Sequence, residues 1–188
     1  MAAVKPEGIA DPKERLAHHI NAYNALSMFN VIDLGIPQTN VGLGQRYRFF
    51  IGRKHVIGGE RISLYDYENL VIRPIGESRV HWALNCSAVS CPKLPQKPFT
   101  GADLEQELER ESRLFFAQER NLRVDASNRT VYLSEIFQFF PEDFVPREAA
   151  NFIAYAKRFV SSEVAASLDE SYQIRFIPYD WTIANWRR

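Results

Sequence analysis

The sequence lacks three features that would suggest a function at once: a net charge, many cysteines and long apolar runs. Its 188 residues carry 23 Lys and Arg against 23 Asp and Glu, so the formal net charge is zero. Nucleic-acid binders usually carry a basic excess that displaces counterions, and we therefore expect no nucleic-acid partner. No apolar run approaches the ~18 residues that a transmembrane helix needs, so we also expect a soluble domain without a membrane span.

The first residues, MAAVKPEG, lack the basic stretch followed by an apolar stretch that marks a secretory signal. We therefore predict no signal peptide in the chain as given and leave the compartment unknown. With only two cysteines, Cys86 and Cys91, the chain is not a disulfide scaffold. The pair is compatible with one short bridge, which adds only ~2 kcal/mol in the chain-entropy model, or with one reactive thiol.

The motifs of common cofactor and metal enzymes are absent as well. The sequence contains no Walker loop, no G-x-G-x-x-G, no G-x-S-x-G and no H-E-x-x-H. His81, Cys86 and Cys91 amount to three zinc-type ligands, whereas a structural zinc site uses four. We therefore predict neither a metal nor a cofactor.

The sequence does contain the material of a hydrophobic core. Hydrophobic residues make up 46% of the chain and aromatic residues 13%, which excludes a disordered protein. Because helical and strand patterns follow one another without regular β-α-β alternation, we predict an α+β fold: a single domain of about six helices on a small, mainly antiparallel sheet. The expected helices include those starting near Asp11-Pro12, Ser63, residue 101, Ser134 and Pro146. Four or five short strands are expected: one or two within 46–51 and 55–57, and the others at 79–86, 122–124, 130–132 and 172–178.

The stretch from His81 to Pro92 gathers the residues most suited to chemistry: one imidazole, two thiols, two hydroxyls and a carboxamide. An imidazole lowers the pKa of a nearby thiol and accepts its proton, and a third polar group orients the imidazole. If residues 79–86 form one strand, His81 and Cys86 point to opposite faces, so a direct pair needs a break near Asn85 or must use Cys91. The alternative is structural, with His81 hydrogen-bonded in the core and the cysteines buried or bridged.

Two asparagines, Asn21 and Asn24, lie on stripes of the first expected helix that otherwise consist of apolar and small residues. Buried carboxamides need partners, because an unpaired one costs ~1–3 kcal/mol. They either hold the backbone of a loop, or one of them orients His81 across the core. Asp180, directly after the last expected strand, either caps backbone groups or serves a site.

These residues fall in segments that together resemble a known family, the domain of unknown function 547, which occurs in bacteria, plants and animals. The matching segments cover about 13–185 and are Ile20-Asn21-Ala22-Tyr23-Asn24-Ala25-Leu26, Ile62-Ser63-Leu64 with Glu68, His81-Trp82-Ala83-Leu84-Asn85-Cys86 with Cys91-Pro92, Leu133-Ser134-Glu135-Ile136-Phe137 and Tyr179-Asp180-Trp181. The resemblance implies a single domain over 13–188, with 1–12 an N-terminal extension or the remnant of a trimmed chain. It also implies kinship with bacterial proteins that are often exported.

The family's name records no activity, so three functions from different classes are carried forward. The first is a cysteine-dependent hydrolase or acyl transferase, similar in its parts to papain and transglutaminases, with Cys86 as nucleophile, His81 as base and Asn21 as orienter. It would act on a small-molecule or peptide substrate, and residues expected in binding roles are Asn24, Asn85, Cys91 and Asp180. The second is a non-catalytic binding module with a structural Cys86–Cys91 disulfide. The third is a thiol–disulfide redox domain.

Overall fold

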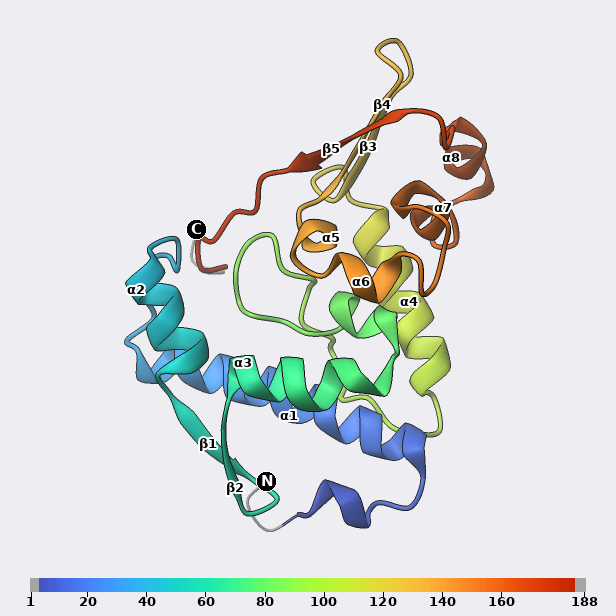
Figure 1. The fold of residues 1–188 in the computed structure, drawn as a ribbon. Helices are drawn as coiled ribbons and strands as arrows, with labels where there is room; N and C mark the ends of the chain where they lie inside the picture. The colour runs from blue at the N-terminus through green and yellow to red at the C-terminus, as the bar shows by residue number, and fades with distance from the viewer. Residues whose placement is uncertain (1–3, 185–188) are drawn as a thin grey trace. The chain divides into compact units, whose positions relative to one another are not determined.

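The structure, a computed structural model, describes residues 4–184 and belongs to the α+β class (Figure 1). By its internal contacts the chain divides into two compact units. The first consists of residues up to 108 together with the segment from 180 onward, and the second of residues 109–179. The predicted α+β class is confirmed, whereas the likeness to papain and transglutaminases stays an analogy.

The first unit is organised around α1, a helix of 22 residues from Pro12 to Asp33. It begins where the sequence predicts, because the Asp11 carboxylate accepts the backbone N–H of Lys13 and Pro12 occupies the first turn. It ends at Asp33, with Leu34 as its C-cap and Gly35 in the left-handed region. The rest of this unit comprises η1 (Pro6–Gly8), α2 (Leu43–Arg46), η2 (Tyr47–Ile51), the antiparallel strands β1 (Lys54–Ile57) and β2 (Glu60–Ser63), α3 (Leu64–Asp66), η3 (Tyr67–Ile72), η4 (Arg73–Ile75), η5 (Ser78–Trp82) and the start of α4 (Leu104–Phe116).

Two predicted strands of this unit are helical in the structure. Residues 46–51 lie in α2 and η2, where Phe49 is buried and Tyr47 and Ile51 are exposed. Residues 78–82 form the short 3-10 helix η5 instead of the start of a strand. Short apolar runs do not distinguish a fully buried helical turn from a buried strand by periodicity alone, which explains both errors. The helix predicted from Ser63 is confirmed, since the Ser63 hydroxyl accepts the N–H of Asp66 at 3.0 Å.

The second unit packs short helices and a three-stranded sheet around a cluster of aromatic rings. The β3–β4 pair is antiparallel, as the hairpin pattern predicts, and β5 adds to β4 in parallel. The rings of Phe137, Phe144 and Tyr155 are fully buried and contact one another. The helix expected at Pro146 begins later, at Phe152, because the Asn151 side chain caps it. The elements are the end of α4, β3 (Leu122–Asp125), β4 (Thr130–Ser134), α5 (Ile136–Phe139), α6 (Pro141–Phe144), α7 (Phe152–Lys157), α8 (Ser162–Ser167) and β5 (Gln173–Ile177).

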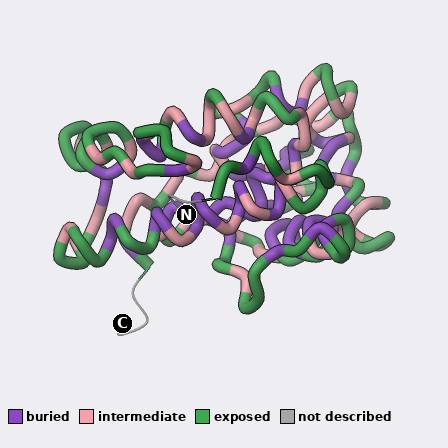
Figure 2. Tube along the Cα trace, turned by 90° about the horizontal axis from the view of Figure 1, so that it is seen from below, coloured by how far each residue is buried: buried purple, intermediate pink, exposed green. Residues whose placement is uncertain are grey.

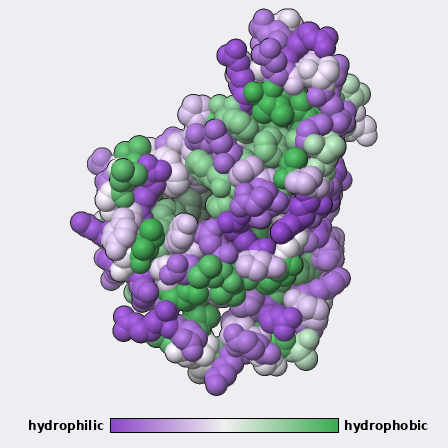
Figure 3. All heavy atoms as spheres, viewed as in Figure 1, coloured by the Kyte–Doolittle hydropathy of each residue, from purple (hydrophilic) through white to green (hydrophobic). Residues whose placement is uncertain are grey.

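Buried and exposed positions interleave along the trace, as expected of short helices that turn one face to a core (Figure 2). In the first unit, apolar side chains also reach the surface over α1 and α3 on the face that Figure 3 shows. No helix within residues 4–184 is long and apolar enough to cross a membrane.

Candidate functional site

Asn21 ties a proline-rich segment to α1. Its side-chain Nδ2 donates to the carbonyl of Phe99 at 2.8 Å, and its Oδ1 accepts the N–H of the same residue at 2.9 Å. The segment 94–99 contains Pro95 and Pro98, which prevent it from forming a regular helix or a strand of a sheet. Its backbone groups therefore need hydrogen-bond partners from other segments, such as Asn21. The ring of Phe99 is buried beside this pair of hydrogen bonds, which we call the Asn21 bracket.

Asn24, one turn along the helix, makes an equivalent bracket on a second segment. Its Nδ2 donates to the carbonyl of Ala83 at 3.0 Å, and its Oδ1 accepts the N–H of Asn85 at 2.8 Å. The side chain is buried, so these two bonds replace the water that both backbone groups would otherwise need. The bracket fixes the backbone immediately before Cys86.

The loop 85–92 is closed on itself by a disulfide and by side-chain bonds. Cys86 and Cys91 are joined, with their Cα atoms 6.1 Å apart, and the N–H of Cys86 donates to Sγ of Cys91 at 2.9 Å. Asn85 donates to the carbonyl of Pro92 at 2.6 Å and accepts the N–H of Ser87 at 2.7 Å. Both cysteines are buried. Of the two states that the sequence left open, bridge or free thiol, the structure contains the bridge.

His81 lies in η5 and is buried in the first unit. Its ring meets that of Trp82 edge-on, with centroids 6.5 Å apart. The carboxamide of Asn21 is occupied on both sides by Phe99, so in this arrangement it does not orient His81. The catalytic roles of Cys86, His81 and Asn21 therefore stay predictions.

Asp180 lies beside the disulfide loop, although the two are about ninety residues apart in sequence. Its N–H donates to the Ser90 hydroxyl at 2.9 Å, and its carboxylate accepts the N–H of Thr182 at 2.9 Å. The following residues bridge the loop at Ala88, which pairs with Ile183. The segment 180–184 thus braces the outside of the loop through backbone and capping bonds.

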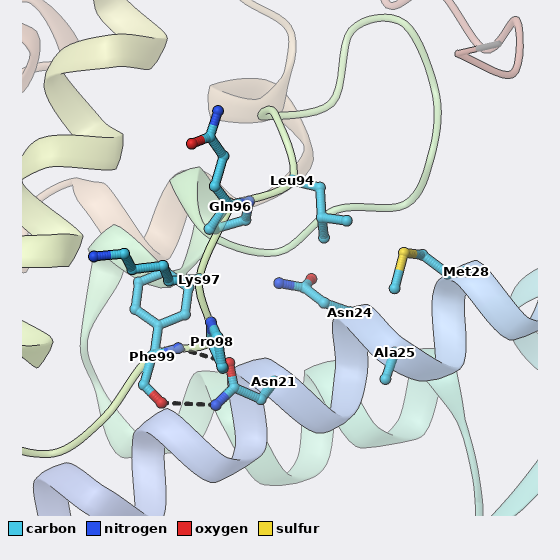
Figure 4. A pocket seen from close by; sticks show the side chains of 10 residues that line it. Asn21, Asn24, Ala25, Met28, Leu94, Gln96, Lys97, Pro98 and Phe99 are labelled. Atoms are coloured by element: carbon cyan, nitrogen blue, oxygen red, sulfur yellow. Dashed lines mark hydrogen bonds between the residues drawn. The ribbon is translucent and has the colours of Figure 1, made fainter. Parts of the chain in front are cut away.

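A cavity of about 340 Å³ lies between α1 and the segment 94–99 (Figure 4). Leu94 from the segment and Met28 from α1 point toward the same space, above Asn24 and Ala25. Leu94 and Met28 are 41% and 39% exposed, so the cavity opens to solvent. Its lining is mostly apolar, and the carboxamides of Asn21 and Asn24 are engaged with backbone. The residues around it are Asn21, Asn24, Ala25, Met28, Leu94, Pro95, Gln96, Lys97, Pro98 and Phe99.

A buried pair with shifted pKa values, His19 of α1 and Tyr67 of η3, also lies in this unit. His19 is buried, and its Nδ1 lies 2.7 Å from the hydroxyl of Tyr67. Burial, assisted by the neighbouring His18, lowers the pKa of His19 to about 4, so the imidazole is neutral at pH 7. Burial likewise raises the pKa of Tyr67. Within residues 4–184 no group of three or more His, Cys, Asp or Glu side chains could hold a metal ion.

Sequence reasoning found the asparagines, the cysteines and Asp180, and the structure brings Asn24, Asn85 and both cysteines into one connected region. The sequence alone did not predict the cavity. Met28 follows Asn24 and Ala25 on α1, and two prolines, Pro95 and Pro98, mark the facing segment. Those two signals belong to segments some 70 residues apart, so only the fold shows that they form one pocket.

Fold and site together describe an α+β protein whose first unit carries a loop braced by a disulfide and by asparagines. The family model described as "Protein of unknown function, DUF547" matches residues 8–116, more than half of the chain, and the chain belongs to this family. The match contains Asn21, Asn24, His81, Cys86 and Cys91. Comparisons with curated proteins and with solved structures found no match.

Proposed function

We propose that the chain is a non-catalytic binding module, and that the cavity between α1 and the segment 94–99 is its ligand site. In this proposal the Cys86–Cys91 disulfide is a structural brace. The observation that carries it is the combination of an open, mostly apolar cavity with walls that are held by the side-chain hydrogen bonds of Asn21 and Asn24. Binding sites of this kind are typically largely formed before the ligand arrives.

Rigidity of both walls supports this role. One wall is α1, and the other is tethered to it by the two bonds between Asn21 and Phe99. Asn24 lies at the floor and anchors the chain that enters the disulfide loop. Ordering these segments in advance lowers the entropic cost of binding. Asn21, which the sequence suggests as a catalytic residue, thus has a structural role that requires no catalysis.

The cavity also limits the ligand. A volume of about 340 Å³ is near the lower end for ligand pockets, which span roughly 300–1,000 Å³. The thioether of Met28 and the branched chain of Leu94 favour an aliphatic group, and methionine adapts to irregular shapes. We therefore assign the site to one aliphatic side chain of a peptide, in line with a peptide among the partners expected from the sequence.

The test uses the methionines, of which the chain has two, Met1 and Met28. Protein labelled with ¹³C at the methionine methyl groups is titrated with N-acetyl-leucinamide, and with N-acetyl-glycinamide as the ligand without a side chain. We expect the Met28 signal, identified by its loss in Met28→Leu, to shift in a saturable way with the leucine probe alone.

A cavity-filling variant locates the effect. Ala25 is half-buried at the cavity, so Ala25→Trp should abolish the saturable shift of Met28. Ala154, an equally half-buried alanine in α7, supplies the matched control: Ala154→Trp should leave the titration unchanged. A Met28 signal that does not respond, or responds equally in Ala25→Trp, contradicts the proposal.

The thiol hydrolase and the redox domain remain predictions with a common requirement. A hydrolase needs the Cys86 thiolate, which exists only after the Cys86–Cys91 bond is reduced. A redox domain needs access to one sulfur, and both residues are buried, at 9% and 5% exposure. Because the cysteines are bridged and buried, we prefer the binding module to the hydrolase and to the redox domain.

A further inference from the structure

The second unit has an open sheet edge beside a second cavity. The strand order is β3-β4-β5, so β3 lies at an edge of the sheet. An edge strand presents backbone N–H and C=O groups that can pair with another chain. Pairing with another chain depends on which of these backbone groups point away from the sheet and on the side chains around them.

The register identifies the outward groups. Leu122 lies opposite Leu133, and the N–H of Ser134 donates to the carbonyl of Asn121 at 2.8 Å. In an antiparallel ladder such bonded pairs alternate with unbonded pairs, so the backbone groups of Leu122 and Val124 face away from β4. The N–H of Leu122 is taken by the carbonyl of Gln118. Within residues 4–184, no backbone bond from outside the strand reaches the N–H or C=O of Val124.

A cavity of about 650 Å³ adjoins this edge. Its apolar lining includes the parallel rings of Phe116 and Phe159, whose centroids lie 5.7 Å apart. Leu122 and Val124 contribute from β3, and Val164 from α8. An edge with outward backbone groups at Val124, next to a pocket lined in part by apolar side chains, is the arrangement that peptide-binding domains use when they add a strand.

The charges beside the edge select the peptide. Arg123 alternates with Leu122 and Val124, and its guanidinium lies over the Tyr132 ring at 4.3 Å from the centroid. No carboxylate within the described part of the chain forms an ion pair with Arg123. A residue placed opposite Arg123 on an added strand would therefore be best as Asp or Glu. The cavity rim carries Arg113 and Glu119 as well, with Arg113 paired to Glu109 at 2.7 Å.

We propose that the edge of β3 is a strand-addition site for an extended peptide in which an apolar residue has an acidic residue on one side, opposite Arg123, and an uncharged residue on the other, opposite Asp125. The apolar residue lies opposite Val124, exchanges backbone hydrogen bonds with it, and places its side chain in the cavity. The acidic neighbour lies opposite Arg123. This site is independent of the cavity in the first unit and of the function proposed there.

A second copy of the chain is the main rival occupant. If two β3 strands paired around Val124, each Arg123 would lie opposite Asp125 of the other copy. The Asp125 carboxylate already accepts bonds from Ser127 and Asn128 in its own turn, which lower its pKa to about 2. Its oxygens already accept these bonds, whereas the carboxylate of a foreign peptide is free to pair with Arg123, so we choose the acidic peptide as the occupant and test self-pairing below.

The experiment is a calorimetric titration of the full chain with acetyl-Thr-Leu-Glu-Leu-Thr-amide, in which a threonine lies opposite Asp125 when the glutamate lies opposite Arg123. Three peptides are compared on the unchanged protein: this peptide, the same peptide N-methylated at both leucines, and the peptide with lysine in place of glutamate. We expect both altered peptides to bind about tenfold more weakly or not at all, since one loses the backbone donors and the other the charge match. Equal binding of all three overturns the proposal.

Variants then locate the site. Val124→Pro removes the outward N–H without touching the ladder to β4, and proline is tolerated on edge strands. It should weaken the acidic peptide about tenfold, whereas Val124→Thr, which keeps the N–H, should not. Val164→Trp, which fills the cavity, should also weaken binding. A concentration-dependent dimer that Val124→Pro dissolves would show self-pairing and overturn the peptide assignment.

Discussion

The two hydrogen bonds of the Asn24 bracket, to Ala83 and Asn85, offer the most direct test of how the disulfide loop is held. In Asn24→Ala the carbonyl of Ala83 and the N–H of Asn85 lose their partners in a buried setting. Each orphaned group costs about 1–3 kcal/mol, so the full loss is about 2–6 kcal/mol. Because Asn24 lines a cavity open to solvent, water can reach part of the gap, and we expect the lower half of that range.

The assay is urea denaturation followed by circular dichroism at pH 7. Asn69 supplies the control, since it also makes two hydrogen bonds, but to Tyr65 and Arg73 within its own helical region. Asn69→Ala should cost less than about 1 kcal/mol, because its partners remain near water. The denaturant slope should stay constant in both variants. If Asn24→Ala costs no more than Asn69→Ala, the bracket does not hold the loop.

A second substitution at the same position should give a pH-dependent stability that a general loss of packing does not. Asn24→Asp keeps an acceptor for the N–H of Asn85 but places a carboxylate against the carbonyl of Ala83. Protonation restores the donor, so the folded state raises the pKa of the new carboxyl above its unfolded value. The variant should therefore recover stability, relative to the native chain, as the pH falls from 7 toward 4. A difference that stays flat across this range would refute the donor role.

Two further predictions concern buried groups of the first unit. His19 has a folded pKa of about 4 against an unfolded value near 6.5, so its stabilisation is complete above pH 6.5 and is lost as the pH falls toward 4, by about 2 kcal/mol at pH 5. His19→Gln should remove that part of the slope in a series of urea titrations, and an unchanged slope would show that His19 is not the group responsible. Replacing Cys86 and Cys91 together by serine opens a short loop and should lower the free energy of unfolding by about 2 kcal/mol. A loss below 0.5 kcal/mol would mean that the bridge braces nothing.

The parts of the fold that local chemistry determines were predictable from sequence. The start of α1 follows from Asp11 and Pro12, and the start of α3 from Ser63 with Asp66, since a cap and its partner lie within three residues. The β3–β4 hairpin follows from two short strand patterns around a polar turn. The runs at 46–51 and 79–86 begin behind less typical caps, in which Gln45 accepts the N–H of Gly42 and Glu77 accepts the N–H of Arg79, and both were assigned wrongly as strands.

The site was predictable only as a set of unusual residues. Asn21 and Asn24 stood out because carboxamides on an apolar face require partners, and the structure supplies those partners in the backbone. Which backbone they hold could not be derived, since Phe99 lies 78 residues from Asn21. The bridge between Cys86 and Cys91 was one of two open states for the same reason: spacing permits it, but only the turn of the loop brings the sulfurs together.

One measurement tests most directly whether these residues brace a binding module or perform thiol chemistry. It is the intact mass of the protein after brief iodoacetamide treatment at pH 7, with and without prior reduction. We expect no adduct on the unreduced protein and two adducts after reduction and unfolding, one at Cys86 and one at Cys91. A single fast adduct at Cys86 on the unreduced protein would contradict this expectation, and would favour the hydrolase instead.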